Sequence, residues 1–415
     1  MMQSLHLNPF SHGGSPKQRL FLASFLVAAL LLRGGAAAVD QKPIEPGWQR
    51  HFLRRGVAPV SKLAKKGPPE DREEQISLVV SNQCDSTIWP GIVTQAGTGP
   101  GTGGFQLEPG EVEQLWVSPE WQGRVWGRTN CSVNGDASWC ETGDCVGKLD
   151  CELSGSTPAT LAEFTLAGGD GGMQTFYDLS LVDGYNLPMA IKYIPAKNTT
   201  FIPPNLTNPA CIATSGWIHS RNDTGTYYSN DSYPIPLETF ETNDSIRNWC
   251  PWKYLAFPPN KPGNGVYPYP DDRIRRPDFS PCNSACSATG SKRDCCEGKY
   301  HDPDICKPSR YSMKIKSICP DAYSFAFDDQ KSTFIIPKGG GFEVIMCPKG
   351  RSTNILRQLG AELFELASSG RLSSMAVSRL RNASYIEEDR SSAGHSTPIS
   401  VVIMSVAIVF SLFLS

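Results

Sequence analysis

The chain has 415 residues, with 39 Lys and Arg against 41 Asp and Glu. This length allows one large domain or two ordinary ones. The nearly neutral charge excludes nucleic acid as an expected partner, because neutralising a phosphate backbone requires a basic surface. Fourteen cysteines against six histidines favour an oxidised, disulfide-bonded framework over metal sites, and no metal or other cofactor is expected.

The N-terminus has the pattern of a signal peptide. Lys17 and Arg19 precede an apolar run over residues 20–32, and the small residues 36–38 follow. This order directs a chain into the secretory pathway, so residues 1–38 are predicted to be removed. The alternative is a signal anchor that stays in the membrane, but the run is short for a bilayer span.

Residues 39–74 are rich in Lys, Arg and Pro and poor in large apolar residues. Such a segment cannot form a packed core, so it is predicted to be a basic pro-segment or a flexible linker. Arg54-Arg55 and Lys65-Lys66 are candidate processing sites. A plain basic linker is the alternative.

From Ile76 onwards, short segments of β-branched and aromatic residues alternate with Gly and Pro turns. The predicted strands cover residues 76–80, 87–93, 113–117, 123–127 and 175–182. Many short strands between such turns are typical of an all-β sandwich or barrel. Residues 318–347 again look β-like and are predicted to return to the sheet that begins near Ile76.

Between about 195 and 306, Pro, Asn, Asp, Tyr and Cys dominate, and apolar periodicity weakens. Loops of this kind need crosslinks to offset the entropy of ordering them. Most Asn-x-Ser/Thr sequons of the chain fall in the same stretch, which predicts a surface location because glycans are bulky and hydrated. The sequons are Asn130, Asn198, Asn205, Asn222, Asn230, Asn243 and Asn382.

Residues 349–394 are predicted to be an amphipathic or partly disordered stalk. Apolar residues between positions 355 and 366 follow helical spacing. No cysteine of the sequence lies beyond Cys347, so the crosslinked framework is expected to end there.

The last residues, 395–415, have the pattern of a lipid-anchor signal. An apolar run ends the chain, and a short polar spacer separates it from small residues upstream. This order is typical of a GPI-anchor signal, with attachment at Ser391 or Ser392 and Asn382 as an earlier candidate. The basic flank that a transmembrane helix usually has on its cytoplasmic side does not follow. A true tail anchor is the alternative.

Six segments stand in order along the chain: WQGRVWGRTNC at 121–131, CETGDCVGKLDC at 140–151, LAEF at 161–164, DLSLVDGYNLPM at 178–189, CNSAC at 282–286, and YS at 311–312 with CPDAYSFAFDD at 319–329. In this order they resemble the thaumatin-like (osmotin-like, pathogenesis-related group 5) family. The family usually has Gly or Phe where this chain has Ser138. The resemblance implies a mainly β fold over residues 75–348. This fold is a two-sheet β-sandwich with a disulfide-rich loop domain, here with a glycosylated insertion at about 196–306.

The resemblance also implies how the cysteines pair. Plant members of the family usually have sixteen cysteines, and this chain has 14. One family cysteine is replaced by an isoleucine near Ile336, and Cys211 stands alone where the family has two cysteines. The implied pairs are Cys84–Cys347, Cys131–Cys140, Cys145–Cys151, Cys211–Cys319, Cys250–Cys282, Cys286–Cys295 and Cys296–Cys306.

Members of this family often have an acidic cleft, lined by one arginine, one glutamate and three aspartates. The matching residues here are Arg124, Glu163, Asp178, Asp183 and Asp328. Carboxylates in one groove can bind sugar hydroxyls, and Arg124 is expected to lower the pKa of a neighbouring carboxylate. Asp178 and Asp183 would face opposite sides of one strand, so Asp183 is expected in the turn before Gly184. Tyr185, Tyr323 or Phe325 is expected to offer an apolar face to a sugar ring.

The resemblance implies a secreted, monomeric surface protein that binds β-1,3-glucan of cell walls. The C-terminal pattern predicts that a lipid anchor holds it at the outer membrane leaflet. A second hypothesis is a weak endo-β-1,3-glucanase, with Glu163 as the acid and Asp178 or Asp183 as its partner. A third is an antifungal, defence or hydrolase-inhibitor protein, which an anchor disfavours. Without the resemblance, Asp183 is an ordinary turn residue and Asp328 belongs to a solvated loop.

Overall fold

The computed structural model of the chain describes residues 75–196, 201–218, 241–260, 265, 281–328 and 332–381. The predicted signal peptide, basic segment and anchor tail lie outside these residues, and so do Asn382, Ser391 and Ser392. The same holds for the sequons Asn198, Asn222 and Asn230. Within the described residues, every helix is too short or too polar to cross a bilayer.

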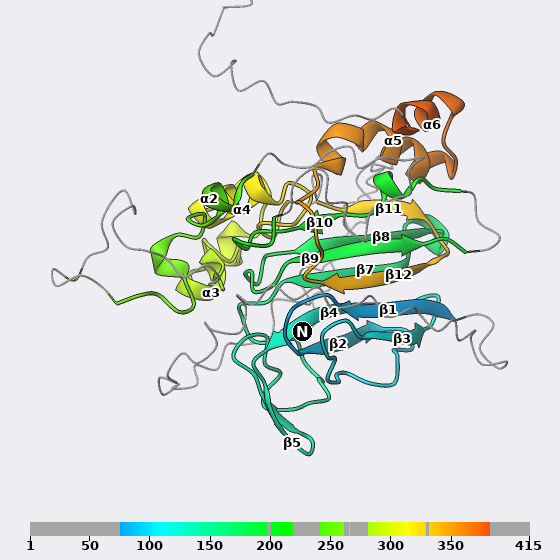
Figure 1. The fold of residues 1–415 in the computed structure, drawn as a ribbon. Coiled ribbons are helices and arrows are strands. Elements are labelled where there is room, and N and C mark those ends of the chain that lie inside the picture. The colour runs from blue at the N-terminus through cyan, green and yellow to red at the C-terminus, as the bar shows by residue number, and fades with distance from the viewer. Residues whose placement is uncertain are drawn as a thin grey trace, which may run out of the picture.

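The body of the molecule is a sandwich of two five-stranded sheets (Figure 1). The first sheet contains, in spatial order, β10 (Ala210–Cys211), β9 (Met189–Ile194), β12 (Gly341–Met346), β1 (Ile76–Asn82) and β3 (Val112–Val117). The second contains β11 (Phe334–Pro337), β8 (Gln174–Ser180), β7 (Leu161–Gly168), β4 (Gln122–Thr129) and β2 (Ile88–Ala96). The prediction of a mainly β, two-sheet sandwich is confirmed.

The two sheets share one hydrophobic core, because alternate side chains of their strands point inwards. Phe342 of β12 lies at its centre, with ring centroids 5.1 Å from Phe164 of β7 and 4.9 Å from Tyr177 of β8. The first and last strands, β1 and β12, run parallel. A disulfide between Cys84 and Cys347 joins the chain just beyond both strands.

The loop domain, which we define as the described residues between 241 and 328, gathers on one side of the sandwich (Figure 1). Short helices replace strands here. They are α2 (Asn243–Ile246), η4 (Trp252–Tyr254), α3 (Ala285–Thr289), η5 (Gly298–Tyr300) and α4 (Arg310–Ile318), whereas η3 (Pro204–Leu206) precedes β10 and contacts α5. The weak apolar periodicity of this stretch did not predict α3 or α4. Both begin with a serine, Ser284 and Ser309, whose side chain accepts a hydrogen bond from the first helical turn.

The seven disulfides of the structure are the pairs that the resemblance implies. They are Cys84–Cys347, Cys131–Cys140, Cys145–Cys151, Cys211–Cys319, Cys250–Cys282, Cys286–Cys295 and Cys296–Cys306. Three of them lie inside the loop domain. A fourth, Cys211–Cys319, joins β10 to the end of α4. Crosslinks of this kind limit the freedom of the unfolded loops.

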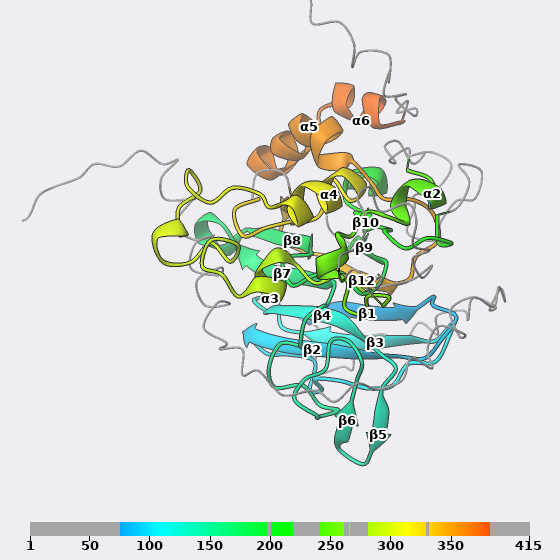
Figure 2. The same ribbon diagram turned by 90° about the vertical axis from the view of Figure 1, so that its left-hand side faces the viewer.

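A second irregular region, which we call the tip lobe, comprises residues 130–156. It contains the two-stranded ribbon of β5 (Ser132–Asn134) and β6 (Ala137–Trp139), which projects from the sandwich at the end opposite to the C-terminal helices (Figure 2). Two disulfides, Cys131–Cys140 and Cys145–Cys151, hold the lobe. The turn η2 (Asp170–Gly172) lies between β7 and β8.

The C-terminal helices α5 (Ile355–Ser369) and α6 (Ser374–Arg381) pack on the sandwich. Apolar side chains of α5 enter the main core, and Leu366 is fully buried. The carboxylate of Asp321 accepts hydrogen bonds from the first backbone amides of α5, at Ile355 (2.8 Å) and Leu356 (2.9 Å). The predicted helical spacing is therefore correct, but these residues belong to the domain rather than to a separate stalk, because their apolar face is buried against it.

Candidate functional site

Three charged side chains lie side by side on the outer face of the second sheet. Arg124 of β4 is directly opposite Glu163 of β7, and Glu163 is directly opposite Asp178 of β8. Directly opposed residues of an antiparallel pair have neighbouring side chains on the same face. We call these three residues the charged row. The strand register alone thus brings together three of the five residues predicted to line a cleft.

The arginine of the charged row is almost fully buried, whereas its carboxylate neighbours are partly open to solvent. Arg124 is 3% exposed, and its Nε lies 3.4 Å from Oε1 of Glu163. Among the described residues, Nε and Nη2 of Arg124 have no hydrogen-bond partner. A buried guanidinium that keeps unused donors is costly. The charged row therefore has hydrogen-bonding capacity left for a ligand oxygen.

Asp183 lies in the turn that follows β8, as expected from its place before Gly184. Gly184 has a φ of 100°, which favours glycine at this position. Burial raises the pKa of Asp183 to about 6; Arg124 opposes this rise and Glu163 adds to it. The electrostatic influence of both residues shows that the turn returns Asp183 to the neighbourhood of the charged row.

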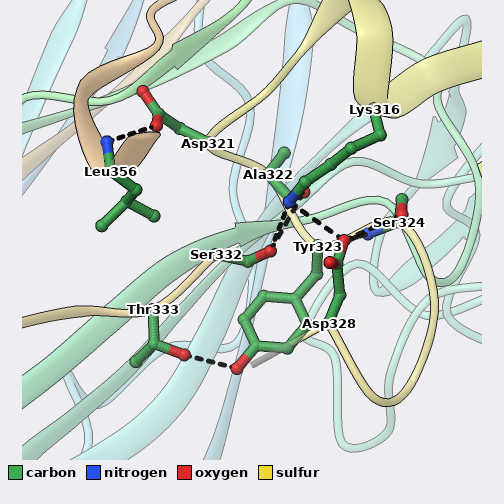
Figure 3. A network of polar contacts seen from close by, with 9 residues as sticks. All are labelled: Lys316, Asp321, Ala322, Tyr323, Ser324, Asp328, Ser332, Thr333 and Leu356. Carbon is green, nitrogen blue, oxygen red and sulfur yellow. Dashed lines mark hydrogen bonds and ion pairs between the residues drawn. The ribbon is translucent and has the colours of Figure 1, made fainter. Parts of the chain in front are cut away.

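Asp328 makes different contacts from the other four predicted residues. Its carboxylate lies 3.0 Å from Nζ of Lys316 and accepts hydrogen bonds from the hydroxyl and the backbone amide of Ser324. Nζ of Lys316 also donates to Ala322 O (3.0 Å) and to the hydroxyl of Ser332 (2.7 Å). Figure 3 shows this network between α4 and the loop beside β8. Asp328 therefore holds this loop in place and is not a member of the charged row.

The three aromatic residues expected to face a sugar differ in burial. Tyr185 is 1% exposed and its hydroxyl pairs with that of Thr214 at 2.6 Å. The expectation for Tyr185 is therefore wrong, because its ring packs against Trp249 inside the core. Tyr323 and Phe325 are half-buried. The hydroxyl of Tyr323 pairs with Thr333, the residue that precedes β11 (Figure 3).

Arg128, which the sequence analysis did not single out, connects the second sheet to the tip lobe. Its guanidinium is fully buried and donates to the carbonyls of Trp89 and Pro90 in β2 and of Lys148 and Leu149 in the lobe. Burial lowers the pKa of Arg128 to about 10. Arg128 stands in the segment WQGRVWGRTNC at 121–131, on the strand that carries Arg124, and this motif was its signal in the sequence.

The sequon asparagines among the described residues differ in their exposure to solvent. Asn130 is exposed, and Asn243 is half-buried at the start of α2, where its side-chain oxygen accepts from the amide of Gly216. Asn205 is 5% exposed, and its amide nitrogen, the atom that a glycan would occupy, donates to Leu380 O of α6 at 2.9 Å. A glycan at Asn205 is therefore incompatible with the packing of α6.

No group of three potential metal ligands occurs among the described residues. Their cysteines are all in disulfides, and the carboxylates of the site face arginine and lysine instead. The chemistry of these residues is that of a polar, charge-lined surface that forms hydrogen bonds.

The sandwich, its crosslinked loops and the charged row define a disulfide-rich, mainly β domain. The Thaumatin family model matches residues 82–348, so the chain belongs to the thaumatin family. Helices α5 and α6 lie beyond the matched residues.

Similar proteins come from flowering plants and a conifer. Thaumatin-like protein 1 of Arabidopsis thaliana is 35% identical over 66% of this chain and 86% of its own length. Pathogenesis-related thaumatin-like protein 3.5 of Cryptomeria japonica is 33% identical over 64% of this chain and 88% of its own. A PR5-like receptor kinase of Arabidopsis thaliana is 32% identical over 67% of this chain but only 35% of its own length.

Proposed function

We propose that this thaumatin-family protein binds β-1,3-glucan of cell walls through the charged row and Asp183. The observation that carries the proposal is the buried Arg124, whose guanidinium has unused donors beside the half-exposed carboxylates of Glu163 and Asp178. Sugar hydroxyls both donate and accept hydrogen bonds, so they suit a row that offers N–H donors and carboxylate acceptors together.

The test is co-sedimentation of the protein with insoluble β-1,3-glucan, comparing wild type with Glu163→Gln and Asp178→Asn. Both variants are expected to lose most of the binding, because each removes a charged acceptor from the row. Glu343→Gln is a matched control. Glu343 also forms a cross-strand ion pair, with Lys192 at 3.4 Å, but in the other sheet. Wild-type binding by Glu163→Gln would contradict the proposal.

A second candidate function is weak endo-β-1,3-glucanase activity, and the raised pKa of Asp183 favours it. Glycoside hydrolysis needs one protonated and one ionised carboxyl group. With a pKa of about 6, Asp183 keeps its proton into the mildly acidic range, so it replaces Glu163 as our candidate acid. Asp183→Asn should then bind laminarin but release no reducing ends, whereas wild type releases them. Absence of release by wild type would leave binding as the whole function.

A defence role is the remaining alternative. Several of the similar proteins are named pathogenesis-related, and binding of wall glucan is compatible with action on a fungal wall. Growth inhibition of a fungus by the purified chain, lost in Glu163→Gln, would support a defence role that depends on the charged row.

We also propose that the chain is exported and attached to the outer cell surface by a lipid. The disulfide-rich domain supports an oxidising compartment, and the sequence of residues 395–415 supports the anchor. Phosphatidylinositol-specific phospholipase should release the protein from intact cells. Retention in the membrane fraction after this treatment would instead support a tail helix.

A further inference from the structure

The tip lobe presents a large aromatic side chain to solvent. Trp139, the last residue of β6, is 67% exposed, although most tryptophans of folded proteins are largely buried. Gly147 lies directly beneath its ring: a Cβ added at Gly147 would lie 2.8 Å from Cζ2 and 3.0 Å from Cη2 of the indole. One face of the indole therefore rests on the Gly147 backbone, and its other face is open.

The position of this indole is fixed by the backbone around it. The carboxylate of Asp144 accepts hydrogen bonds from the amides of Cys140 and Gly147, both at 2.9 Å. The amide of Ser138 donates to Gly147 O at 2.9 Å. The residues on either side of Trp139 are thus tied to the glycine beneath its ring, and the Cys131–Cys140 bond closes the ribbon beside it. The open face of the indole is a rigid platform.

A second apolar residue stands next to this platform. Val146, which precedes Gly147 in the chain, is 69% exposed and has a φ of 60°. A β-branched residue is rarely found in this left-handed region. The strain is maintained although the side chain gains almost no burial. Strained backbone of this kind is concentrated at binding and catalytic sites.

The platform and the charged row belong to the same face of the second sheet. Arg124, Trp126 and Arg128 alternate along β4 and therefore point to the same side. Trp126 donates to Gly143 O, and Arg128 donates to Lys148 O, so the tip lobe covers both. From Arg124 to Arg128, β4 advances about 13 Å. A ligand that contacts both the charged row and Trp139 must therefore extend from the charged row along β4 toward the tip lobe.

We propose that Trp139 and Val146 form a second contact site for the same polysaccharide chain. The open indole stacks on the apolar face of a pyranose ring several units away from the charged row. This inference rests on the proposed glucan binding. A standard protein interface buries about 800 Å² on each partner. One indole face is far smaller than this, so it suits a single sugar ring better than a protein partner. The site is therefore expected to add affinity only for long chains.

The experiment measures the affinity of the full chain for laminaritriose and for long-chain laminarin by calorimetry. Trp139→Ala should bind long laminarin about tenfold more weakly and bind laminaritriose as wild type does. Trp139→Phe should restore most of the long-chain affinity, because a flat ring returns. Phe364→Ala is the control. Phe364 is 75% exposed on α5, at the opposite end of the molecule (Figure 2), and no role is proposed for it.

The outcomes distinguish glucan binding by the charged row from the second contact site at Trp139. Equal long-chain affinity of Trp139→Ala and wild type would overturn this inference and leave the charged row as the whole site. An equal loss in Phe364→Ala would also overturn it, because the loss would not depend on the platform. If wild type binds neither ligand, the proposed glucan binding fails, and the second contact site fails with it.

Discussion

The sandwich and the crosslinked loops of this protein are ordered by different forces. In the sandwich, paired strands and a shared core of rings such as Phe342, Phe164 and Tyr177 exclude water, so burial provides most of the stability. The loop domain contains short helices and three internal disulfides. There, crosslinks add to the burial of rings such as Trp249 and Tyr311 in the shared core, because they lower the entropy of the unfolded loops.

The backbone angles show the same contrast. Four non-glycine residues among the described ones have a positive φ: Asn130, Val146, Cys296 and Cys347. Two of them are disulfide cysteines, and the other two are direct neighbours of Cys131 and Cys145. Strain is therefore found where covalent bonds fix the chain, and the strand interiors avoid it.

The largest expected effect comes from removing a ring of the sandwich core. Phe342 is 2% exposed and contacts the rings of Phe164, Tyr177 and Tyr193. Phe342→Ala should lower the free energy of unfolding by about 4 kcal/mol, because it leaves a cavity. Urea unfolding measures this loss. Phe342→Leu keeps most of the volume and should cost much less; an equal cost would mean that the lost ring contacts, and not the cavity, are the cause.

The second effect tests the loop domain. Replacing both Cys250 and Cys282 by alanine removes a crosslink between residues 32 positions apart and should cost about 3 kcal/mol. Hydrogen exchange should become faster in α3 and α4 while β7 and β8 stay protected, since the loops lose a constraint and the sandwich core is unchanged. Uniformly faster exchange in both regions would show that the sandwich also depends on this crosslink. It would contradict the proposed difference in how the sandwich and the loop domain are stabilised.

The third effect concerns Asp183, at the boundary of the two regions. Because its pKa is raised to about 6, the folded state binds this proton more tightly than the unfolded chain does. The stability that Asp183 contributes is therefore fully present below about pH 4 and is lost as the pH rises through about 6. Asp183→Asn should thus stabilise the protein by about 2 kcal/mol at pH 7 and have little effect at pH 4.

Thermal unfolding of Asp183→Asn and wild type between pH 4 and pH 7 measures this difference. Glu343→Gln, in the first sheet, is the control and should show no such dependence on pH. A constant difference between Asp183→Asn and wild type at every pH would contradict the pKa of Asp183 and, with it, the role of this residue as a proton donor.

The sequence predicted the sandwich better than it predicted the contacts of the site. Short segments of β-branched residues such as 76–80 are local signals and match β1. The family motifs implied the cysteine pairs and the residues of the charged row, and the strands β4, β7 and β8 that carry this row are formed by the motifs themselves. The turn position of Asp183 also followed from a local signal, the glycine after it.

Contacts between distant segments were not predictable in this way. The helical spacing between 355 and 366 is the same for a stalk and for a helix packed on its own domain, so the docking of α5 through Asp321 needed the structure. Asp328 carries the right chemistry for the cleft, but its carboxylate is engaged by Lys316 from α4. The exposed face of Trp139 depends on Gly147, eight residues further along the chain.

The smallest expected effect separates strain from burial in the tip lobe. Asparagine tolerates a positive φ better than valine does, and the 69% exposed side chain of Val146 contributes little burial. Val146→Asn should therefore raise the free energy of unfolding by about 1 kcal/mol, measured by urea unfolding. Val125→Asn, the same change at a fully buried position of the sandwich, should strongly destabilise the folded protein. If Val146→Asn stabilises the fold and also weakens binding of long laminarin, the strain at Val146 is retained for binding; a loss of stability would show that valine is held there by packing.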